Sequence, residues 1–226
     1  MAIVDWLFPK LCIGCGEVGA YICPLCLNKL LVIANPICPL CLRGSLWGRT
    51  HRWCRTKSSL DGLVSVMAYK GLVEKIVKTY KYRYVQTLTT DLVELMISMG
   101  DWSAIEGKAW VVVAVPLHPQ RERWRGFNQA VELAKGLAKY GHWRYEENIL
   151  VRQRATPAQM SLGRAERQVN LVGAFESGLK IQAVRGRQVL LVDDVWTTGA
   201  TLRECAKVLK QHGASEVWGV TLARAV

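Results

Sequence analysis

Seven of the eight cysteines lie between residues 12 and 54, mostly in pairs whose members are separated by two residues. Such a gap lets a tight turn direct two side chains at one point, and two turns complete the tetrahedron that zinc prefers. Pairing neighbouring turns predicts two structural Zn²⁺ sites, with the ligands Cys12, Cys15, Cys23 and Cys26 in one and Cys38, Cys41, His51 and Cys54 in the other. With four protein ligands each, neither site leaves an open position for catalysis.

Disulfide bonds and redox-active thiols are the alternatives for these cysteines. A disulfide framework needs an oxidising compartment, for which nothing in the sequence argues, and a redox pair would not occur three times in tandem. His51 taken alone is more often an exposed histidine than a ligand, but its spacing to Cys54 repeats that of the cysteine pairs. Gly14 or Gly16, and Gly44, lie where such turns need a positive φ or a close approach.

A second set of chemically capable residues occurs in the stretch VLLVDDVWTTGATL, residues 189–202. An apolar strand ends there on Asp193 and Asp194, whose carboxylates suit the hydroxyls of a vicinal diol and repel a phosphate. The loop that follows begins a predicted helix, so its free amides, its hydroxyls and the helix dipole favour an anion. Its members are Thr197, Thr198, Gly199, Ala200 and Thr201. The two parts together predict a site for a ribose 5-phosphate.

Arginines alternate with tryptophans around the last predicted zinc ligands, at Arg43, Trp47, Arg49, Arg52, Trp53 and Arg55. Arginines neutralise phosphates and indoles stack on unpaired bases, so one prediction is contact with single-stranded nucleic acid. The other is that Trp47 and Trp53 cap the zinc turns against the rest of the protein. The net charge of +12, from 30 Lys+Arg and 18 Asp+Glu, favours an anionic partner, although a basic surface also serves solubility.

An α/β domain is predicted to position the diol and phosphate residues. Four apolar segments are predicted as buried strands, at residues 61–69, 110–116, 187–194 and 216–226, and a shorter strand is predicted at 148–152. Apolar residues recur at intervals of three or four residues, as in amphipathic helices, in the segments 72–82, 88–99, 128–140 and 202–212. This alternation predicts a parallel sheet with helices on both faces, whose ligands bind at the carboxyl ends of the strands.

The length of 226 residues fits one medium α/β domain plus a small module. We expect the zinc module in residues 1–60 and the α/β domain in residues 61–226. The longest apolar run, AWVVVAV, is too short to cross a bilayer, so no membrane span is expected. The first ten residues lack the pattern of a secretory signal, and zinc-binding thiols must stay reduced, so we expect a cytoplasmic protein.

The stretch VLLVDDVWTTGATL closely resembles the phosphoribosyl pyrophosphate (PRPP) binding motif of type I phosphoribosyltransferases. Residues 115–134 are similar to the segment that follows a buried strand in the ComF family of competence proteins, and residues 152–175 to its mobile segment. With its cysteine pattern, the chain is identified as a member of that family, which joins an N-terminal double zinc ribbon to a type I phosphoribosyltransferase domain. The resemblance covers essentially the whole chain.

This resemblance implies the role of each residue at a PRPP site. Asp193 and Asp194 would hold the ribose 2- and 3-hydroxyls, and residues 197–201 the 5-phosphate. The turn near the pyrophosphate would consist of Pro116, Leu117 and His118. Arg121, Arg123 or Arg125 would supply positive charge there, and with the two aspartates they form the candidate catalytic set. Magnesium (Mg²⁺), bound with PRPP, and the arginines would stabilise the departing pyrophosphate.

Three further features of the sequence bear on this site. Lys78 and Lys81 are similar to a basic family segment that approaches the same anion, and an amphipathic helix explains them nearly as well. Residues 152–167 would fold over the ligand as a lid, or else form an ordinary basic loop. Trp196 occupies a position where the family more often has a smaller aliphatic residue, which predicts a narrower ribose pocket.

The resemblance leaves three functions open. The first is a PRPP-binding protein that handles single-stranded DNA during DNA uptake and natural transformation, with the uptake machinery as a partner. The second is an active phosphoribosyltransferase that transfers the pentosyl group to a nucleobase or amine. The third is a PRPP sensor that changes its affinity for a partner without turnover. No acceptor pocket can be read from the residues, so the sequence does not decide whether the protein is an enzyme.

Overall fold

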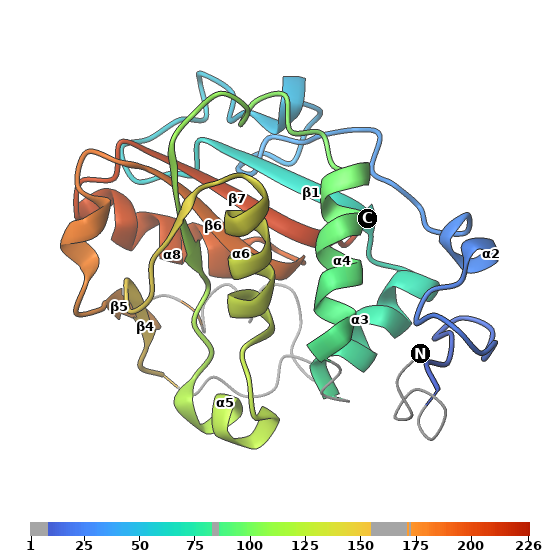
Figure 1. The fold of residues 1–226 in the computed structure, drawn as a ribbon. Helices are drawn as coiled ribbons and strands as arrows, with labels where there is room; N and C mark the ends of the chain where they lie inside the picture. The colour runs from blue at the N-terminus through green and yellow to red at the C-terminus, as the bar shows by residue number, and fades with distance from the viewer. Residues whose placement is uncertain (1–8, 83–85, 155–170, 172) are drawn as a thin grey trace.

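A computed structural model of the chain describes residues 9–82, 86–154, 171 and 173–226. Its centre is a five-stranded parallel sheet in the order β1-β7-β6-β2-β3 (Figure 1). The strands are β1 (Gly62–Ala68), β2 (Trp110–Ala114), β3 (Arg144–Tyr145), β6 (Gln188–Trp196) and β7 (Glu216–Arg224). Within the described part of the chain, no helix has the length and apolar character needed to span a membrane.

Helices cover both faces of the sheet, which confirms the predicted fold class. Helices on one face are α3 (Leu72–Tyr82), α4 (Gln86–Met99) and α6 (Gln129–Tyr140). They pack on strand side chains such as Leu190 and Trp218, and Figure 1 shows α4 and α6 in front of the sheet. The other face is covered by α8 (Ala200–Gln211) and the 3₁₀ helix η2 (Ile181–Val184). These pack on Leu191 and Val217, so the inner strands are apolar on both sides.

The prediction of a parallel strand at residues 148–152 is wrong about its partner. β4 (Leu150–Arg152) pairs antiparallel with β5 (Phe175–Ser177) in a separate two-stranded sheet. This pair packs against α8, while β3 takes the edge position next to β2. Three alternating residues fit a parallel or an antiparallel neighbour equally well, so the sequence pattern carried too little information about the pairing.

The cysteine-rich N-terminal segment lies along β1, at one edge of the sheet. Val32 forms an antiparallel bridge with Met67, and Arg49 forms one with Gly62. These contacts cover backbone groups that an edge strand would otherwise leave unpaired. Within its described residues, the regular elements of the segment are α2 (Pro24–Leu27) and the 3₁₀ helix η1 (Leu46–Gly48). Figure 1 shows the segment in blue, running from α2 to the turns beside β1.

Asp61 joins the end of this segment to the α/β domain. Its buried carboxylate pairs with Arg55 Nη2 at 2.5 Å and with Lys210 Nζ at 2.6 Å. It also accepts a hydrogen bond from the backbone N–H of Val217 at 2.8 Å. Burying a carboxylate costs free energy unless such partners replace water. Because the three partners belong to the N-terminal segment, to the helix at residues 200–211 and to β7, Asp61 connects three separate parts of the chain.

Candidate metal centres and anion-binding cleft

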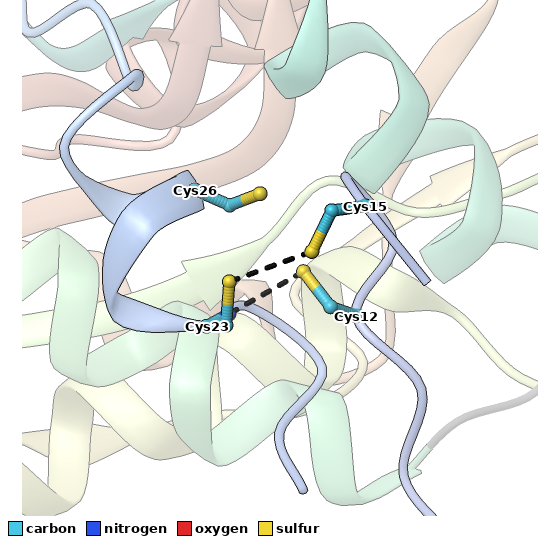
Figure 2. A group of neighbouring side chains, drawn as sticks. All are labelled: Cys12, Cys15, Cys23 and Cys26. Carbon is cyan, nitrogen blue, oxygen red and sulfur yellow. Dashed lines mark hydrogen bonds between the residues drawn. The ribbon is translucent and has the colours of Figure 1, made fainter. Parts of the chain in front are cut away.

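The first cysteine group brings four thiols together, as predicted. Figure 2 shows the side chains of Cys12, Cys15, Cys23 and Cys26 pointing toward one another, and their sulfurs all lie within 4.8 Å of one another. The Cys23 N–H donates to Cys12 Sγ at 3.4 Å, which is the largest cause of a Cys12 pKa lowered to about 6. Zinc binds thiolates, so this backbone donor favours the form that a metal requires.

Two cysteine turns share the same backbone geometry. Gly16 N–H donates to the Cys12 carbonyl at 2.8 Å, and Leu42 N–H donates to the Cys38 carbonyl at 2.9 Å. Both residues are left-handed, with φ of 83° at Gly16 and 61° at Leu42. The predicted conformational role of Gly44 is therefore wrong, because Leu42 takes the left-handed position in the second turn. Gly14 has the predicted close approach, since a Cβ there would lie 2.5 Å from Cys26 Sγ.

The second group consists of Cys38, Cys41, His51 and Cys54, whose ligand atoms also lie within 4.8 Å of one another. His51 Nδ1 lies 3.2 Å from Cys41 Sγ, while His51 Nε2 lies 3.1 Å from the Gly44 carbonyl oxygen. A donor hydrogen on Nε2 leaves Nδ1 as the ligand atom, an arrangement common among metal-binding histidines. The structure brings the four predicted ligands of each site together, and the donor sets of both groups fit zinc.

A cleft lies at the carboxyl ends of β2 and β6, where the sequence predicted the ligand site. Most predicted site residues line it, namely Lys81, Pro116, Leu117, Arg121, Arg125, Asp193, Asp194, Thr197 and Thr201. His118 instead caps α5 (Pro119–Arg125) by accepting a hydrogen bond from Gln120 N–H at 3.3 Å, and Arg123 is exposed on the same helix. The cleft therefore gathers residues that lie more than 100 positions apart in the sequence.

The two aspartates of the cleft differ in their electrostatic surroundings. Lys81 Nζ pairs with Asp194 Oδ2 at 2.6 Å, and Asp193 Oδ1 accepts from the Asp194 N–H at 2.8 Å. Burial and the neighbouring Asp194 charge raise the pKa of Asp193 to about 8. Burial is the largest single influence on the pKa of Lys81 and lowers it, but the charge and hydrogen bond of Asp194, together with the charge of Asp193, raise it by more in sum. Asp194 thus has a lysine as a direct ion-pair partner, whereas the hydrogen bond to the Asp193 carboxylate comes from a backbone N–H.

The loop after β6 lines the cleft through Thr197 and Thr201, whereas Thr198, Gly199 and Ala200 are buried and are not among the lining residues. Gly199 is left-handed, with a φ of 76°, and forms the N-cap of α8. A Cβ at Gly199 would lie 2.1 Å from the Trp196 ring, so only glycine allows this approach. Trp196 is 2% exposed and is not among the residues that line the cleft. The prediction that Trp196 narrows the ribose pocket is therefore wrong, because its indole supports the loop instead.

Four cationic side chains face the two aspartates in this cleft, from Lys81, Arg121, Arg125 and Arg152. Arg125 hydrogen-bonds to Gln129 Oε1 and lies over the Tyr82 ring, with 5.4 Å to the ring centroid. Burial and the Arg121 charge lower the pKa of Arg152. Gln129 was missed by the sequence analysis. Arg152 was considered only as the start of a lid segment, and residues 155–167 of that segment lie outside the described residues.

The arginines and tryptophans near the second zinc site occupy two kinds of surroundings. Trp53 is 81% exposed and stacks on the His51 ring with 4.6 Å between centroids, and Arg43 and Arg52 are also exposed. Arg55, by contrast, pairs with Asp61, and the Arg49 guanidinium lies 5.6 Å from the Trp218 ring. These two arginines are also exposed but help to attach the segment to the domain, so Arg43, Arg52 and Trp53 are the better candidates for contacting a ligand.

Comparison with known proteins follows the same division of the chain. A double zinc ribbon domain model matches residues 3–56, and a phosphoribosyl transferase domain model matches residues 131–225. Competence protein ComFC of Bacillus subtilis is 31% identical over 217 residues, which cover 90% of this chain and 84% of that protein. The chain belongs to the ComF family. Its zinc sites are therefore those of a ComF-family double zinc ribbon.

Two further similarities of this ComF-family protein are more limited in extent. DNA utilization protein YhgH of Escherichia coli O6:H1 is 39% identical over 109 residues, so the aligned stretch spans about half the length of each protein, 47% of either. Among solved structures, the allosteric regulatory enzyme of purine biosynthesis aligns with a TM-score of 0.40 and 22% identity. That alignment covers 61% of this chain and 26% of the other.

Proposed function

We propose that this protein binds PRPP together with Mg²⁺ in the cleft at the carboxyl ends of β2 and β6, and that it serves DNA uptake by handling single-stranded DNA. One observation carries the proposal: a pair of carboxylates, four cationic side chains, and Thr197 and Thr201 at the N-terminus of α8 all line one cleft. The cations outnumber the carboxylates, which favours an anionic ligand. PRPP is a ligand with a diol in the middle and phosphates at both ends.

The proposed binding mode assigns each part of PRPP to one side of the cleft. Asp193 and Asp194 accept hydrogen bonds from the ribose 2- and 3-hydroxyls, and residues 197–201 bind the 5-phosphate at the α8 N-terminus. The turn at residues 116–118 lies near the pyrophosphate, whose charge Arg121 and Arg125 offset. Mg²⁺ prefers phosphate oxygens with one or two carboxylates as ligands, so it would enter with the pyrophosphate.

The role in DNA uptake is supported by the relatives and by the exposed basic surface. The relatives are called a competence protein and a DNA utilization protein, and the exposed Arg43, Arg52 and Trp53 offer phosphate and base contacts. The proposed site of action is the cytoplasm, because the two zinc sites need seven thiols in the reduced form.

Calorimetric titration of the whole protein with PRPP and Mg²⁺, with and without a single-stranded oligonucleotide, tests both ligands together. We expect saturable PRPP binding that weakens when Mg²⁺ is omitted, and oligonucleotide binding that weakens as salt increases. Ribose 5-phosphate should bind more weakly than PRPP, since it lacks the pyrophosphate. No heat from PRPP at millimolar concentration would contradict the ligand assignment, and no oligonucleotide binding at low salt would remove the DNA role.

The nucleic-acid surface has its own test in a matched pair of variants. Arg52→Gln should weaken oligonucleotide binding and make the salt dependence shallower by about one unit of slope. Lys139→Gln removes the same charge from α6, which packs on β3 at the opposite edge of the sheet, and should leave both quantities unchanged. Equal effects of the two variants would show that net charge alone, and not this surface, binds DNA.

A second candidate function is phosphoribosyl transfer to an acceptor, and one observation favours it. A larger cleft of about 550 Å³ adjoins the first and shares Pro116, Leu117 and Arg152 with it. Phe127 and Tyr145 line this second cleft and could contact a planar acceptor. Pyrophosphate release from PRPP that depends on an added nucleobase or amine would support the activity. A broad acceptor screen without such release would leave PRPP as a bound ligand only.

A further inference from the structure

Arg203 of α8 connects the second zinc site to the anion-binding loop. Its Nη1 donates to the Pro39 carbonyl oxygen at 3.0 Å, and its Nη2 donates to the Thr198 carbonyl oxygen at 2.7 Å. Pro39 lies between the zinc ligands Cys38 and Cys41, and Thr198 lies in the loop assigned to the 5-phosphate. One guanidinium therefore bridges two sites that are 159 positions apart in the sequence, from Pro39 to Thr198.

The contacts of the Arg203 guanidinium require an arginine at this position. The guanidinium lies 5.7 Å from the ring centroid of Trp196, the same indole that supports Gly199. Arginine offers two parallel donors in a planar fork, whereas the ammonium of a lysine is a single point that cannot replace both. The Thr198 carbonyl is thus held from the ribbon side of the molecule. The cleft side of the loop is left to contact a ligand.

We propose that Arg203 is a positioning residue that couples occupancy of the second zinc site to the affinity of the loop for the 5-phosphate of PRPP. The proposal rests on PRPP binding as proposed above. With zinc bound, the turn at residues 38–41 holds the Pro39 carbonyl in place, and Arg203 holds the loop ready for phosphate. Without zinc that turn loses its fixed shape, so the loop must be ordered at the moment of binding, which lowers affinity.

Thermodynamic linkage makes the effect reciprocal. If zinc in the second site raises the affinity for PRPP, then bound PRPP must raise the affinity for that zinc by the same factor. Zinc loss from the second site should therefore slow when PRPP is bound. The first zinc site, formed by Cys12, Cys15, Cys23 and Cys26, has no described contact with Arg203 and should not respond.

Arg224 provides a matched control. It lies at the end of β7 and is 8% exposed, whereas Arg203 is half-buried, and its Nη2 donates to the backbone carbonyl of Asn35 in the N-terminal segment at 3.1 Å. Asn35 lies between the two groups of zinc ligands and not within a cysteine turn, and Arg224 does not line the cleft. Arg224→Gln and Arg203→Gln thus each remove one arginine contact with the ribbon, but only the second removes the contact with the loop.

The experiment measures zinc transfer from the whole protein to a chromophoric chelator, with and without PRPP at constant free Mg²⁺. In the wild type we expect two phases, of which PRPP slows one by about tenfold. Removing the second site by His51→Ala should abolish the sensitive phase and leave the other. Arg203→Gln should abolish the response to PRPP and weaken PRPP binding by about tenfold, while Arg203→Lys should retain part of the response. Arg224→Gln should behave as the wild type does.

The outcomes separate this proposal from the proposed function. If the wild type does not bind PRPP, both are overturned. If it binds PRPP but neither zinc phase slows, the coupling is overturned and the ligand assignment stands. A full response to PRPP in Arg203→Gln would likewise overturn the role of this residue. The wild-type response and the Arg203→Lys variant give a decision even if Arg203→Gln does not fold.

Discussion

The two adjacent carboxylates at the end of β6 meet different partners, and this difference defines the cleft. Asp194 pairs with Lys81 at 2.6 Å, whereas the pKa of Asp193 is raised to about 8 by burial and by the charge of Asp194. A diol that donates hydrogen bonds replaces the water that burial removes, and it stabilises the ionised pair. Without a ligand, burial and mutual repulsion therefore disfavour the charge on Asp193, and a ligand with two hydroxyl donors would reduce this unfavourable free energy.

The raised pKa of Asp193 predicts how stability depends on pH. An unfolded aspartate has a pKa of about 3.9, so between roughly pH 4 and pH 8 the folded state holds a proton that the unfolded state has lost. The free energy of unfolding should therefore fall as pH rises through this window, relative to that of Asp193→Asn. Urea unfolding of both proteins without PRPP checks this. A stability difference that stays constant from pH 5 to pH 8 would contradict the assignment.

Asp61 predicts a large loss of stability from one substitution. Asp61→Ala would leave the Lys210 ammonium, whose side chain is 9% exposed, without its carboxylate partner and with the Ser215 carbonyl oxygen as its remaining described acceptor. Breaking a buried ion pair in this way costs about 3 kcal/mol or more. Arg55→Ala removes only a partner whose side chain is 57% exposed, and should cost about 1 kcal/mol or less. Chemical denaturation that gave similar losses for both would show that Asp61 is not the central partner.

Single residues mark the limit of what the sequence could predict. The zinc ligands and the aspartate pair were identifiable, because their spacing follows from the geometry of turns and strand ends. The left-handed conformation of Leu42 was not predictable, since a leucine rarely adopts a positive φ. The role of Arg203 was not predictable either, because an arginine on an amphipathic helix is usually solvated. Its contact with Pro39 is known only from the folded structure.

At the scale of elements, the loop between β6 and α8 depends on one glycine. Gly199→Ala would place a methyl group 2.1 Å from the Trp196 ring at a φ of 76°, so the loop would have to move. We expect stability to fall by about 2 kcal/mol and PRPP affinity to fall with it. Gly186→Ala is the control, because its φ is 69° and no atom lies within 4 Å of the added methyl.

Thermal melting and PRPP titration of these two alanine variants separate crowding from backbone strain. Equal losses of stability in both would mean that the left-handed φ alone matters. An unchanged PRPP affinity in Gly199→Ala would show that this loop does not bind the ligand, whatever its stability.

Long buried strands were predictable as elements, and short ones were not. The segments predicted at 61–69, 110–116 and 216–226 contain β1, β2 and β7, and the segment predicted at 187–194 covers β6 except for Val195 and Trp196. Runs of aliphatic residues of this length are typical of buried strands. β3 has two residues and β4 three, too few for any periodicity to show which sheet they join. The order of the strands also depends on packing that no local pattern records.

At the scale of the whole molecule, the zinc module and the α/β domain form one connected structure. The N-terminal segment pairs with β1, contacts Asp61 through Arg55, and reaches the anion-binding loop through Arg203. A cleft that binds a small anion and an exposed basic surface therefore lie on parts of the protein that touch. The boundary between a zinc module in residues 1–60 and an α/β domain in residues 61–226 remains a proposal. The contacts of Arg55 and Arg203 cross that boundary.

Zinc content tests the N-terminal half of this architecture. Metal analysis of the purified protein should find two zinc ions per chain, and His51→Ala should retain one, because three ligands hold zinc less tightly than four. Removing both ions should unfold the N-terminal module, since its small core cannot form without metal. One zinc ion in the wild type would contradict the second site. Two in His51→Ala would show that His51 is not a ligand.

The most direct test of the whole account is PRPP binding by the wild type and by Asp193→Asn combined with Asp194→Asn. Calorimetry with PRPP and Mg²⁺ should give saturable binding to the wild type and an affinity lower by about 100-fold or more in the double variant, which loses two charged acceptors. The exposed Asp101→Asn is the control and should bind as the wild type does. Retained affinity in a double variant that is still folded would contradict the account.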